Sequence, residues 1–164
     1  MKKYNVGIVG YGWAAEAHIQ AIDATPMAQV TAVCSSRKLA PAALAAKHGH
    51  PVRVFHSLDE MLAQPDLHAV SVCSYHKQHP EHIIAAARAG KHIIAEKPLA
   101  LNTWDALAML KAAARNKRQL LLATKFRHVP ELATARELIQ TGKLGVPIAF
   151  EVSFCSPVDM TKRW

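Results

Sequence analysis

The sequence predicts an α/β fold in which a doubly wound parallel sheet is covered by helices on both faces. Three observations support this fold class. Short apolar runs alternate with longer alanine-rich stretches, the connections between them are short, and a glycine-rich turn joins the first run to the first stretch. This alternation is typical of parallel strands linked by right-handed helical crossovers. The 164 residues, 51% apolar and 20% charged, suit a globular domain rather than a disordered chain.

The apolar periodicity and the helix start and stop signals place each element in order. Strands are expected at 6–9, 30–34, 52–55, 68–73, 91–95 and 119–124. Helices are expected at 14–24, 39–48, 80–89, 103–116 and 130–141. A further short helix is opened by the capping-box spacing of Ser57 and Glu60. No repeat or linker interrupts residues 1–142, so we expect them to form one domain.

The segment after residue 142 has a different pattern. Residues 147–155 alternate between apolar and mostly smaller or polar side chains, which is typical of a half-buried strand in an antiparallel sheet. We expect residues 143–164 to be the start of a truncated second α/β domain for substrate binding and oligomerisation. The unpaired edge of this strand and its apolar face predict a homo-oligomer; that face consists of Ile148, Phe150, Val152 and Phe154.

The distribution of charge restricts the classes of partner that we expect the chain to bind. The net charge is +8, and residues 83–164 carry thirteen Lys and Arg against six Asp and Glu, which suits an anionic ligand, a nucleic acid or a solvated face. Several of these cations end the helix at 103–116, where they complement its dipole, and only 6% of residues are aromatic. We therefore expect no nucleic-acid partner. No run of 18 uncharged apolar residues is present, so we expect no membrane partner.

The positions of the cysteines and histidines indicate where in the cell the chain resides and whether it binds a metal. Cys34, Cys73 and Cys155 are far apart, which favours reduced thiols in the cytoplasm over disulfides or a zinc site. Glycines interrupt the first apolar run, which argues against a signal peptide. Three histidines are spaced by three residues at positions 76, 79 and 82, but no carboxylate or cysteine ligand is evident beside them. We therefore expect no metal.

The turn between the first strand and the first helix has the pattern of a phosphate-binding loop. Gly10 allows a tight turn, Gly12 lets a pyrophosphate approach the backbone, and the small Ala15 lets helix and strand pack closely. The helix N-terminus offers unpaired N–H groups to the phosphates. Trp13 either lines the cofactor cleft or caps the sheet. The pattern opens a βαβ unit, so residues 1–142 are predicted to be a dinucleotide-binding Rossmann domain. The alternatives are a glycine-rich turn without a ligand, or a flavin or S-adenosylmethionine site.

The end of the second strand bears on which dinucleotide binds. NAD sites usually place a carboxylate there to bind the ribose 2′-hydroxyl, and this chain has Ser35, Ser36, Arg37 and Lys38 instead. Hydroxyls and cations suit a 2′-phosphate. We therefore expect NADP, with NAD as the alternative; the cations could also simply begin a solvated helix.

Ligands of doubly wound sheets bind beyond the carboxyl ends of the strands. The segments that follow the predicted strands should therefore line one rim, and they are rich in polar and cationic residues. These segments are 10–13, 35–37, 74–79, 96–98 and 125–128.

A family resemblance rests on these residues. The glycine turn, the run Ala-Gly-Lys-His-Ile-Ile-Ala-Glu-Lys-Pro at 89–98, the pair Arg127 and Pro130, and residues 138–145 together resemble the glucose–fructose oxidoreductase / inositol dehydrogenase / MocA family. The resemblance covers essentially the whole chain. It implies an NAD(P)-dependent oxidoreductase that moves hydride to or from a hydroxyl or carbonyl group of a polyol- or sugar-like substrate. It makes Lys97 the catalytic residue and places Glu96 near the nicotinamide.

One segment departs from the family pattern. The family commonly has Thr-Pro-Asn and a later histidine where this chain has Ser74, Tyr75, His76 and His79. The resemblance implies cofactor contacts from Ser74, His76, His79 and Arg127, with an altered pocket wall at 75–76. Lys97 precedes a proline, whose extended backbone preference can aim the lysine into a cleft.

Two other functions stay open. The chain could be a non-catalytic dinucleotide-binding or interaction module, and nucleic-acid binding rests on net charge alone. The resemblance implies a second domain that carries substrate contacts and a catalytic histidine. We therefore expect the 164-residue chain to bind NAD(P) with negligible dehydrogenase activity of its own.

Overall fold

The computed structural model describes residues 3–153 and residue 155. The chain divides into two compact units, residues 1–124 and 125–164, and each is described by itself. The first unit holds the sheet. The compact unit around the sheet ends at Thr124, and the domain boundary expected after residue 142 stays a prediction.

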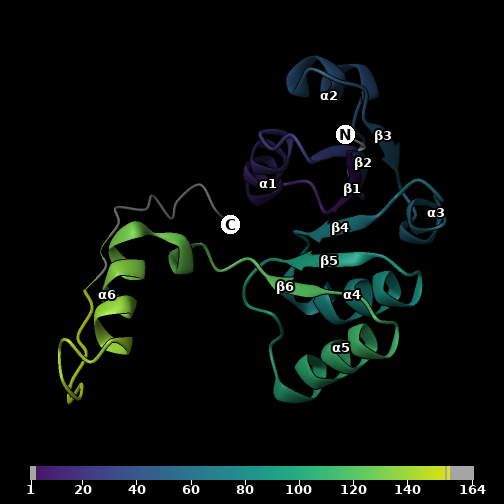
Figure 1. The fold of residues 1–164 in the computed structure, drawn as a ribbon. Helices are drawn as coiled ribbons and strands as arrows, with labels where there is room; N and C mark the ends of the chain where they lie inside the picture. Colours follow the sequence, from purple (N-terminus) through teal and green to yellow (C-terminus); the bar gives the residue numbers. More distant parts are fainter. Residues whose placement is uncertain (1–2, 154, 156–164) are drawn as a thin grey trace. The chain divides into compact units, whose positions relative to one another are not determined.

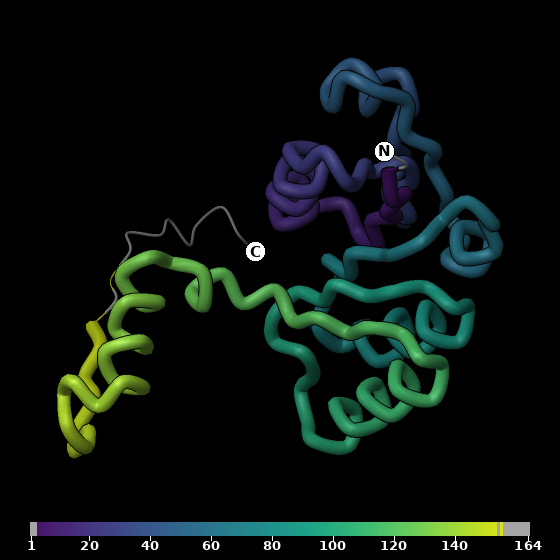
Figure 2. The backbone as a smooth tube through the Cα atoms, viewed as in Figure 1, coloured from purple at the N-terminus to yellow at the C-terminus, as the bar shows by residue number. Residues whose placement is uncertain are grey.

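The first unit is built on six parallel strands in the order β3-β2-β1-β4-β5-β6, as expected for a doubly wound sheet (Figure 1). The order reverses between β1 and β4, which creates the switch point where ligands of such sheets bind. The strands are β1 (Tyr4–Val9), β2 (Ala28–Cys34), β3 (Arg53–Phe55), β4 (Ala69–Val72), β5 (His92–Ala95) and β6 (Leu120–Leu122). Figure 2 follows the sheet unit from its purple and blue strands β1 to β3 to its teal and green strands β4 to β6.

Helices connect these strands close to the expected positions. They are α1 (Trp13–Asp23), α2 (Pro41–His48), α3 (Leu58–Leu62), α4 (His79–Arg88) and α5 (Thr103–Arg115), with a short 3-10 turn η1 (His76–Gln78) before α4. The Ser57 side chain accepts a hydrogen bond from the Glu60 backbone N–H, which confirms the expected cap of α3.

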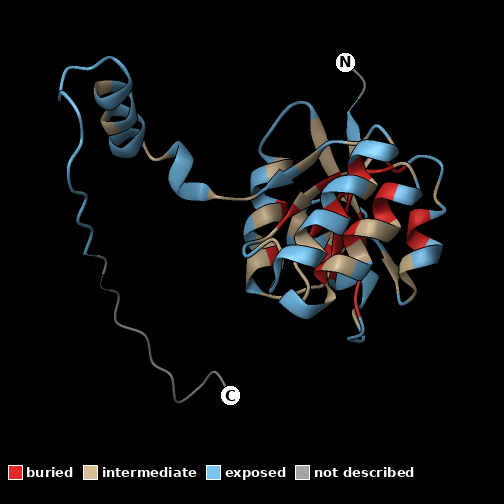
Figure 3. Cartoon of the chain, turned by 90° about the horizontal axis from the view of Figure 1, so that it is seen from below, coloured by how far each residue is buried: buried red, intermediate tan, exposed pale blue. Residues whose placement is uncertain are grey.

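The sheet is covered on both faces, and the core therefore forms two clusters (Figure 3). Successive strand residues point to opposite faces, so Ile8 packs with α1 and α2 while Val9 packs with α3, α4 and α5. On the α1 face, Ala15 and Ile19 of α1 are fully buried against the sheet. Helix α1 is therefore fixed by its apolar face, and its N-terminus lies at the carboxyl end of β1.

The second unit holds a 3-10 turn η2 (Lys125–His128) and helix α6 (Pro130–Gln140), in which no residue is buried. The strand expected at 147–155 is wrong for the part of it that the structure describes. Residues 147–153 and 155 have no strand conformation, because a strand needs a neighbour for its backbone hydrogen bonds and no described segment pairs with them. Phe154 and residues 156–164 lie outside the described residues.

Among the described helices, none combines the length and the apolar character needed to cross a membrane.

Candidate functional site

Gly10 brings the turn after β1 against the end of β4. Its backbone has φ +85°, and its N–H donates to the Cys34 carbonyl oxygen at 2.8 Å. A Cβ at this position would lie 2.9 Å from the Cα and N of Ser74. Only glycine fits such a close approach with a positive φ. The turn is therefore held between the carboxyl ends of β2 and β4, as the sequence predicts.

Gly12 has a different role. It is the N-cap of α1 with an extended backbone, no side chain caps this helix, and a Cβ added at Gly12 would meet nothing within 4 Å. The space beside Gly12 is thus open at the uncapped N-terminus of α1, where the helix dipole favours an anion. Ala15 is fully buried, as expected, whereas Trp13 is 78% exposed and does not cap the sheet. This arrangement fits the pyrophosphate of a dinucleotide.

The loop after β2 is shaped by Ser35, which is almost fully buried. The Ser35 hydroxyl accepts a hydrogen bond from the Arg37 N–H at 3.1 Å, and the Ser35 carbonyl oxygen lies 2.9 Å from Nδ1 of His56. Ser36 and Arg37 are exposed. The loop therefore holds its backbone by internal bonds and leaves the Arg37 guanidinium for a ligand.

The loop after β4 carries Ser74, whose hydroxyl lies 2.8 Å from Nδ1 of His82. Burial lowers the pKa of His82, which keeps its imidazole neutral at neutral pH. Ser74 is half-buried, and His76 is exposed with its ring edge-on to His79 at 5.7 Å between centroids. The hydroxyl and His76 thus lie on the rim, where the sequence places them.

His79 differs from the expectation of a direct cofactor contact. Its side chain is fully buried, with Nε2 3.1 Å from the Ser74 carbonyl oxygen and Nδ1 3.0 Å from the Pro98 carbonyl oxygen. Both ring nitrogens lie within hydrogen-bond distance of backbone carbonyl oxygens, so neither nitrogen of the buried ring faces a ligand. His79 instead ties the loop after β4 to the loop after β5.

Glu96 and Lys97 follow β5, and the Lys97–Pro98 peptide bond is cis. The Glu96 N–H group is bonded to the Val72 carbonyl oxygen at 2.9 Å, which keeps this residue against the end of β4. Oε1 of Glu96 lies 3.0 Å from Nε2 of His18, and Oε2 accepts the Lys97 N–H at 2.9 Å. The Lys97 side chain is exposed. Both oxygens of the Glu96 carboxylate are therefore bonded within the protein, whereas the Lys97 ammonium is available to a ligand.

Arg127 lies in η2 of the second unit and is exposed. Its predicted cofactor contact stays a prediction. Among the described residues no group of three histidine, cysteine or acidic side chains could hold a metal ion.

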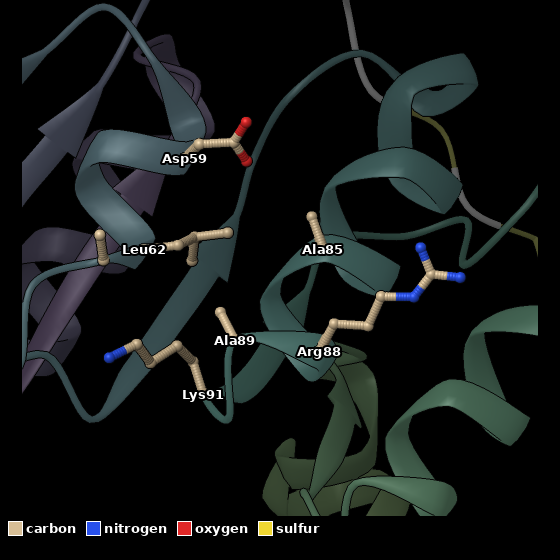
Figure 4. Close-up of a pocket in the computed structure, with 7 residues that line it drawn as sticks. Asp59, Leu62, Ala85, Arg88, Ala89 and Lys91 are labelled. Carbon is tan, nitrogen blue, oxygen red and sulfur yellow. The ribbon is translucent and has the colours of Figure 1, made fainter.

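A separate surface pocket of about 640 Å³ lies at the opposite, amino edge of the sheet. Figure 4 shows Asp59 and Leu62 from α3 opposite Ala85 from α4, while the side chain of Arg88 extends away from α3. Lys91, just before β5, is almost fully buried and donates to the carbonyl oxygens of Gln64 at 2.8 Å and Leu67 at 2.9 Å. This lysine fastens the chain between α3 and β4. The pocket is thus remote from the glycine turn.

Sequence reasoning missed two residues beneath the rim, His18 and Ser71. Neither residue belongs to a motif of the sequence, and Ser71 lies within the apolar run expected to form the strand at 68–73. The structure brings His18 to both Ser71 and Glu96, which lie 53 and 78 residues away in the chain.

Residues 4–124 match the family model described as an oxidoreductase family with an NAD-binding Rossmann fold, the model of the glucose–fructose oxidoreductase / inositol dehydrogenase / MocA group. The chain belongs to this family. The resemblance of the glycine turn and the Glu-Lys-Pro run is thereby confirmed, and with it the NAD(P)-binding fold class.

Relatives of the family include sugar and polyol dehydrogenases. The chain is 32% identical over 161 residues to the levoglucosan dehydrogenase of Pseudarthrobacter phenanthrenivorans, covering 94% of this chain and 41% of the relative. It is 31% identical over 161 residues to the inositol 2-dehydrogenase of Rhizobium meliloti, covering 96% of this chain and 48% of the relative. The chain thus spans less than half the length of these relatives.

A solved structure of the family agrees in fold. The 3-ketoreductase of Actinomadura kijaniata, in complex with TDP-benzene and NADP, superimposes with a TM-score of 0.77 at 28% identity, covering 86% of this chain and 43% of that chain.

Proposed function

We propose that this chain binds the dinucleotide of an NAD(P)-dependent oxidoreductase that acts on a hydroxyl or carbonyl group of a polyol- or sugar-like substrate. One observation carries the proposal. The uncapped N-terminus of α1 opens onto free space at Gly12, and the exposed Lys97 follows β5 at the same edge of the sheet. The dehydrogenases of P. phenanthrenivorans and R. meliloti support the substrate class.

In this proposal different residues contact different parts of the dinucleotide. Gly10 and Gly12 admit the pyrophosphate to the α1 amides, and the hydroxyl of Ser74 with His76 lines the nicotinamide side. When bound, the nicotinamide ring supplies the hydride donor or acceptor. When the carbon that bears a substrate hydroxyl gives up hydride, the hydroxyl also releases its proton to water, and the Lys97 ammonium stabilises the alkoxide that develops on the oxygen.

NADP is the preferred cofactor in this proposal. Arg37 is exposed at the end of β2, and no carboxylate stands in the loop from Ser35 to Lys38 to bind a free 2′-hydroxyl. A guanidinium beside the exposed hydroxyl of Ser36 suits a 2′-phosphate through charge-assisted hydrogen bonds, while the buried Ser35 holds the loop. The NADP bound to the A. kijaniata reductase is in line with this choice.

Self-association through residues 147–155 is the corresponding proposal for the second unit. Ile148, Phe150 and Val152 are all strongly exposed, and apolar side chains on an unpaired segment favour pairing with another strand. Light scattering after size-exclusion chromatography should give a mass above that of the monomer, and Phe150→Lys should return it to the monomer. A monomeric starting protein would contradict this part. The free thiols of Cys34, Cys73 and Cys155 support a reducing, cytoplasmic location.

Calorimetric titration tests the main proposal. The chain should bind NADPH at one site per protomer, more tightly than NADH. A chain that binds neither dinucleotide would overturn the proposal. Binding without hydride exchange is expected of this chain alone, since we expect it to have negligible dehydrogenase activity of its own. Turnover of a polyol or sugar by this chain that Lys97→Ala abolishes would rule out the non-catalytic module.

A further inference from the structure

A continuous set of polar contacts runs beneath the rim, on the α1 face of the sheet. Its centre is His18, in the second turn of α1, whose side chain is only 14% exposed. Nδ1 of His18 lies 2.7 Å from the Ser71 hydroxyl in β4, and Nε2 lies 3.0 Å from Oε1 of Glu96 after β5. One side chain therefore joins the helix of the phosphate-binding turn to two strand ends.

The hydrogens of this set can be assigned consistently. The Glu96 carboxylate only accepts, so it takes the Nε2–H of His18 and the backbone N–H of Lys97. A neutral imidazole that donates from Nε2 accepts at Nδ1, and the Ser71 hydroxyl supplies that hydrogen. The Cys73 sulfur lies 3.7 Å from the Ser71 oxygen. Burial raises the pKa of Cys73 to about 11, so its thiol keeps the hydrogen that it can donate to Ser71.

With the hydrogens placed in this way, every polar side-chain atom of His18, Ser71 and Glu96 has a partner. Both oxygens of Glu96 are thereby held in place. Since Oε1 is held by His18, Oε2 is turned toward the Lys97 N–H. The orientation of the Lys97 backbone therefore depends on a residue of α1. Such fully satisfied networks in a low-dielectric setting hold their members rigidly.

We propose that His18 is a positioning residue. Through Glu96 it fixes the position of the Lys97 backbone relative to the phosphate-binding turn. Lys97 is thereby placed beside the nicotinamide half of the cofactor. This inference rests on the proposed dinucleotide function. It assigns His18 no contact with the cofactor. Its effect is confined to the nicotinamide half, because the adenine half meets the loop after β2 instead.

A second histidine–carboxylate pair in the same unit provides a matched comparison. His50 lies 2.8 Å from Asp23, with side chains 16% and 20% exposed, against 14% and 22% for His18 and Glu96. Asp23 is the last residue of α1 and also accepts the Val30 N–H at 2.8 Å. The two pairs thus share chemistry, helix and burial, but the second lies at the opposite end of α1 from the turn.

The test measures two ligands on each variant by calorimetry. NADPH reports the whole site, and 2′,5′-ADP reports the adenine half without the nicotinamide. His18→Phe keeps the ring volume and removes both hydrogen bonds. It should weaken NADPH binding about tenfold and leave 2′,5′-ADP binding unchanged. His50→Phe should leave the affinity for both ligands unchanged, whatever it costs in thermal stability.

Two further variants keep the test decisive. His18→Gln retains a side-chain N–H for Glu96 and should restore part of the NADPH affinity. If circular dichroism shows that His18→Phe is unfolded, Ser71→Ala replaces it, since it removes only the hydrogen bond to Nδ1. That variant should give a smaller loss with the same selectivity for NADPH.

The outcomes separate this inference from the proposed function. Equal losses for NADPH and 2′,5′-ADP, or no loss for either in folded His18 and Ser71 variants, would overturn the positioning role and leave the dinucleotide site standing. A wild-type chain that binds neither ligand would overturn the proposed function, and the positioning role with it.

Discussion

The carboxyl and amino edges of the same parallel sheet both carry charged side chains, yet the two edges use them differently. At the amino edge, Lys91 donates to two backbone carbonyls, and Arg53 makes two hydrogen bonds to Asp66 at 2.8 and 3.0 Å. At the carboxyl edge, Arg37 and Lys97 are exposed, and among the described residues neither side chain has a hydrogen-bond or ion-pair partner.

This difference between the two edges separates the charges that stabilise the fold from those that are available to a ligand. A buried cation that donates to backbone carbonyls, as Lys91 does, stabilises the chain connection where it lies. An exposed cation beside an uncapped helix N-terminus contributes little to stability and offers its charge to an anion. Changes at the carboxyl edge should therefore weaken binding, and changes at the amino edge should weaken the fold.

The largest expected effect is on binding, from Gly12→Val. The backbone of Gly12 is extended and its surroundings are open, so valine fits the fold but occupies the space of the pyrophosphate. NADPH affinity measured by calorimetry should fall at least about 100-fold, which corresponds to about 2.8 kcal/mol. Gly49→Val is the control: it places valine at a left-handed C-cap and should lower the melting temperature without changing NADPH affinity.

At the amino edge, Lys91→Met should destabilise the fold. Methionine keeps the apolar stem but leaves the Gln64 and Leu67 carbonyl oxygens without their donor. We expect a loss of about 2 kcal/mol in the free energy of unfolding, measured by denaturant titration. NADPH affinity should not change. Lys111→Met, at an exposed position of α5, should cost less than about 0.5 kcal/mol; equal losses in the two variants would contradict the distinction between the edges.

A smaller effect is expected from Arg37→Ala. Removing the guanidinium should lower NADPH affinity about tenfold and leave NADH affinity unchanged, because only NADPH carries the 2′-phosphate. Lys111→Ala removes the same charge far from the rim and should change neither affinity. Equal affinities for NADPH and NADH in the starting protein would refute the NADP preference.

The smallest expected effect is a pH dependence of stability. Burial lowers the pKa of His82 in the folded chain below its unfolded value of about 6.5. The folded state therefore binds this proton less readily, so the stability is fully present above about pH 6.5 and is lost as the pH falls through the lowered pKa. Denaturant titrations from pH 7.5 to 4.5 should show a shallower decline for His82→Gln than for the exposed His128→Gln; matching slopes would argue against this assignment.

Local patterns were sufficient to predict much of this structure. The parallel sheet follows from the alternation of short apolar runs with helices, and the turn at Gly10 and Gly12 follows from the known demands of a strand–turn–helix connection. The cap at Ser57 is a three-residue pattern and was confirmed. Each of these features is decided within one connection of the chain.

Features that depend on distant partners were not predictable in this way. The partners of His18 lie 53 and 78 residues away, and both ring nitrogens of His79 meet backbone carbonyls that no side-chain pattern encodes. Lys91 was expected to begin a strand, and its burial depends on carbonyls that end another element. The alternation at 147–153 is a genuine strand pattern, but a strand also requires a neighbour.

Amide hydrogen exchange with and without NADPH tests the difference between the two edges most directly. Binding at the carboxyl edge should slow exchange in the peptides that contain Gly12 to Glu16, Ser35 to Arg37, and Glu96 to Lys97. Peptides at the amino edge that contain Gln64 to His68 should exchange at the same rate in both samples. Protection confined to the amino edge and its pocket would contradict the account.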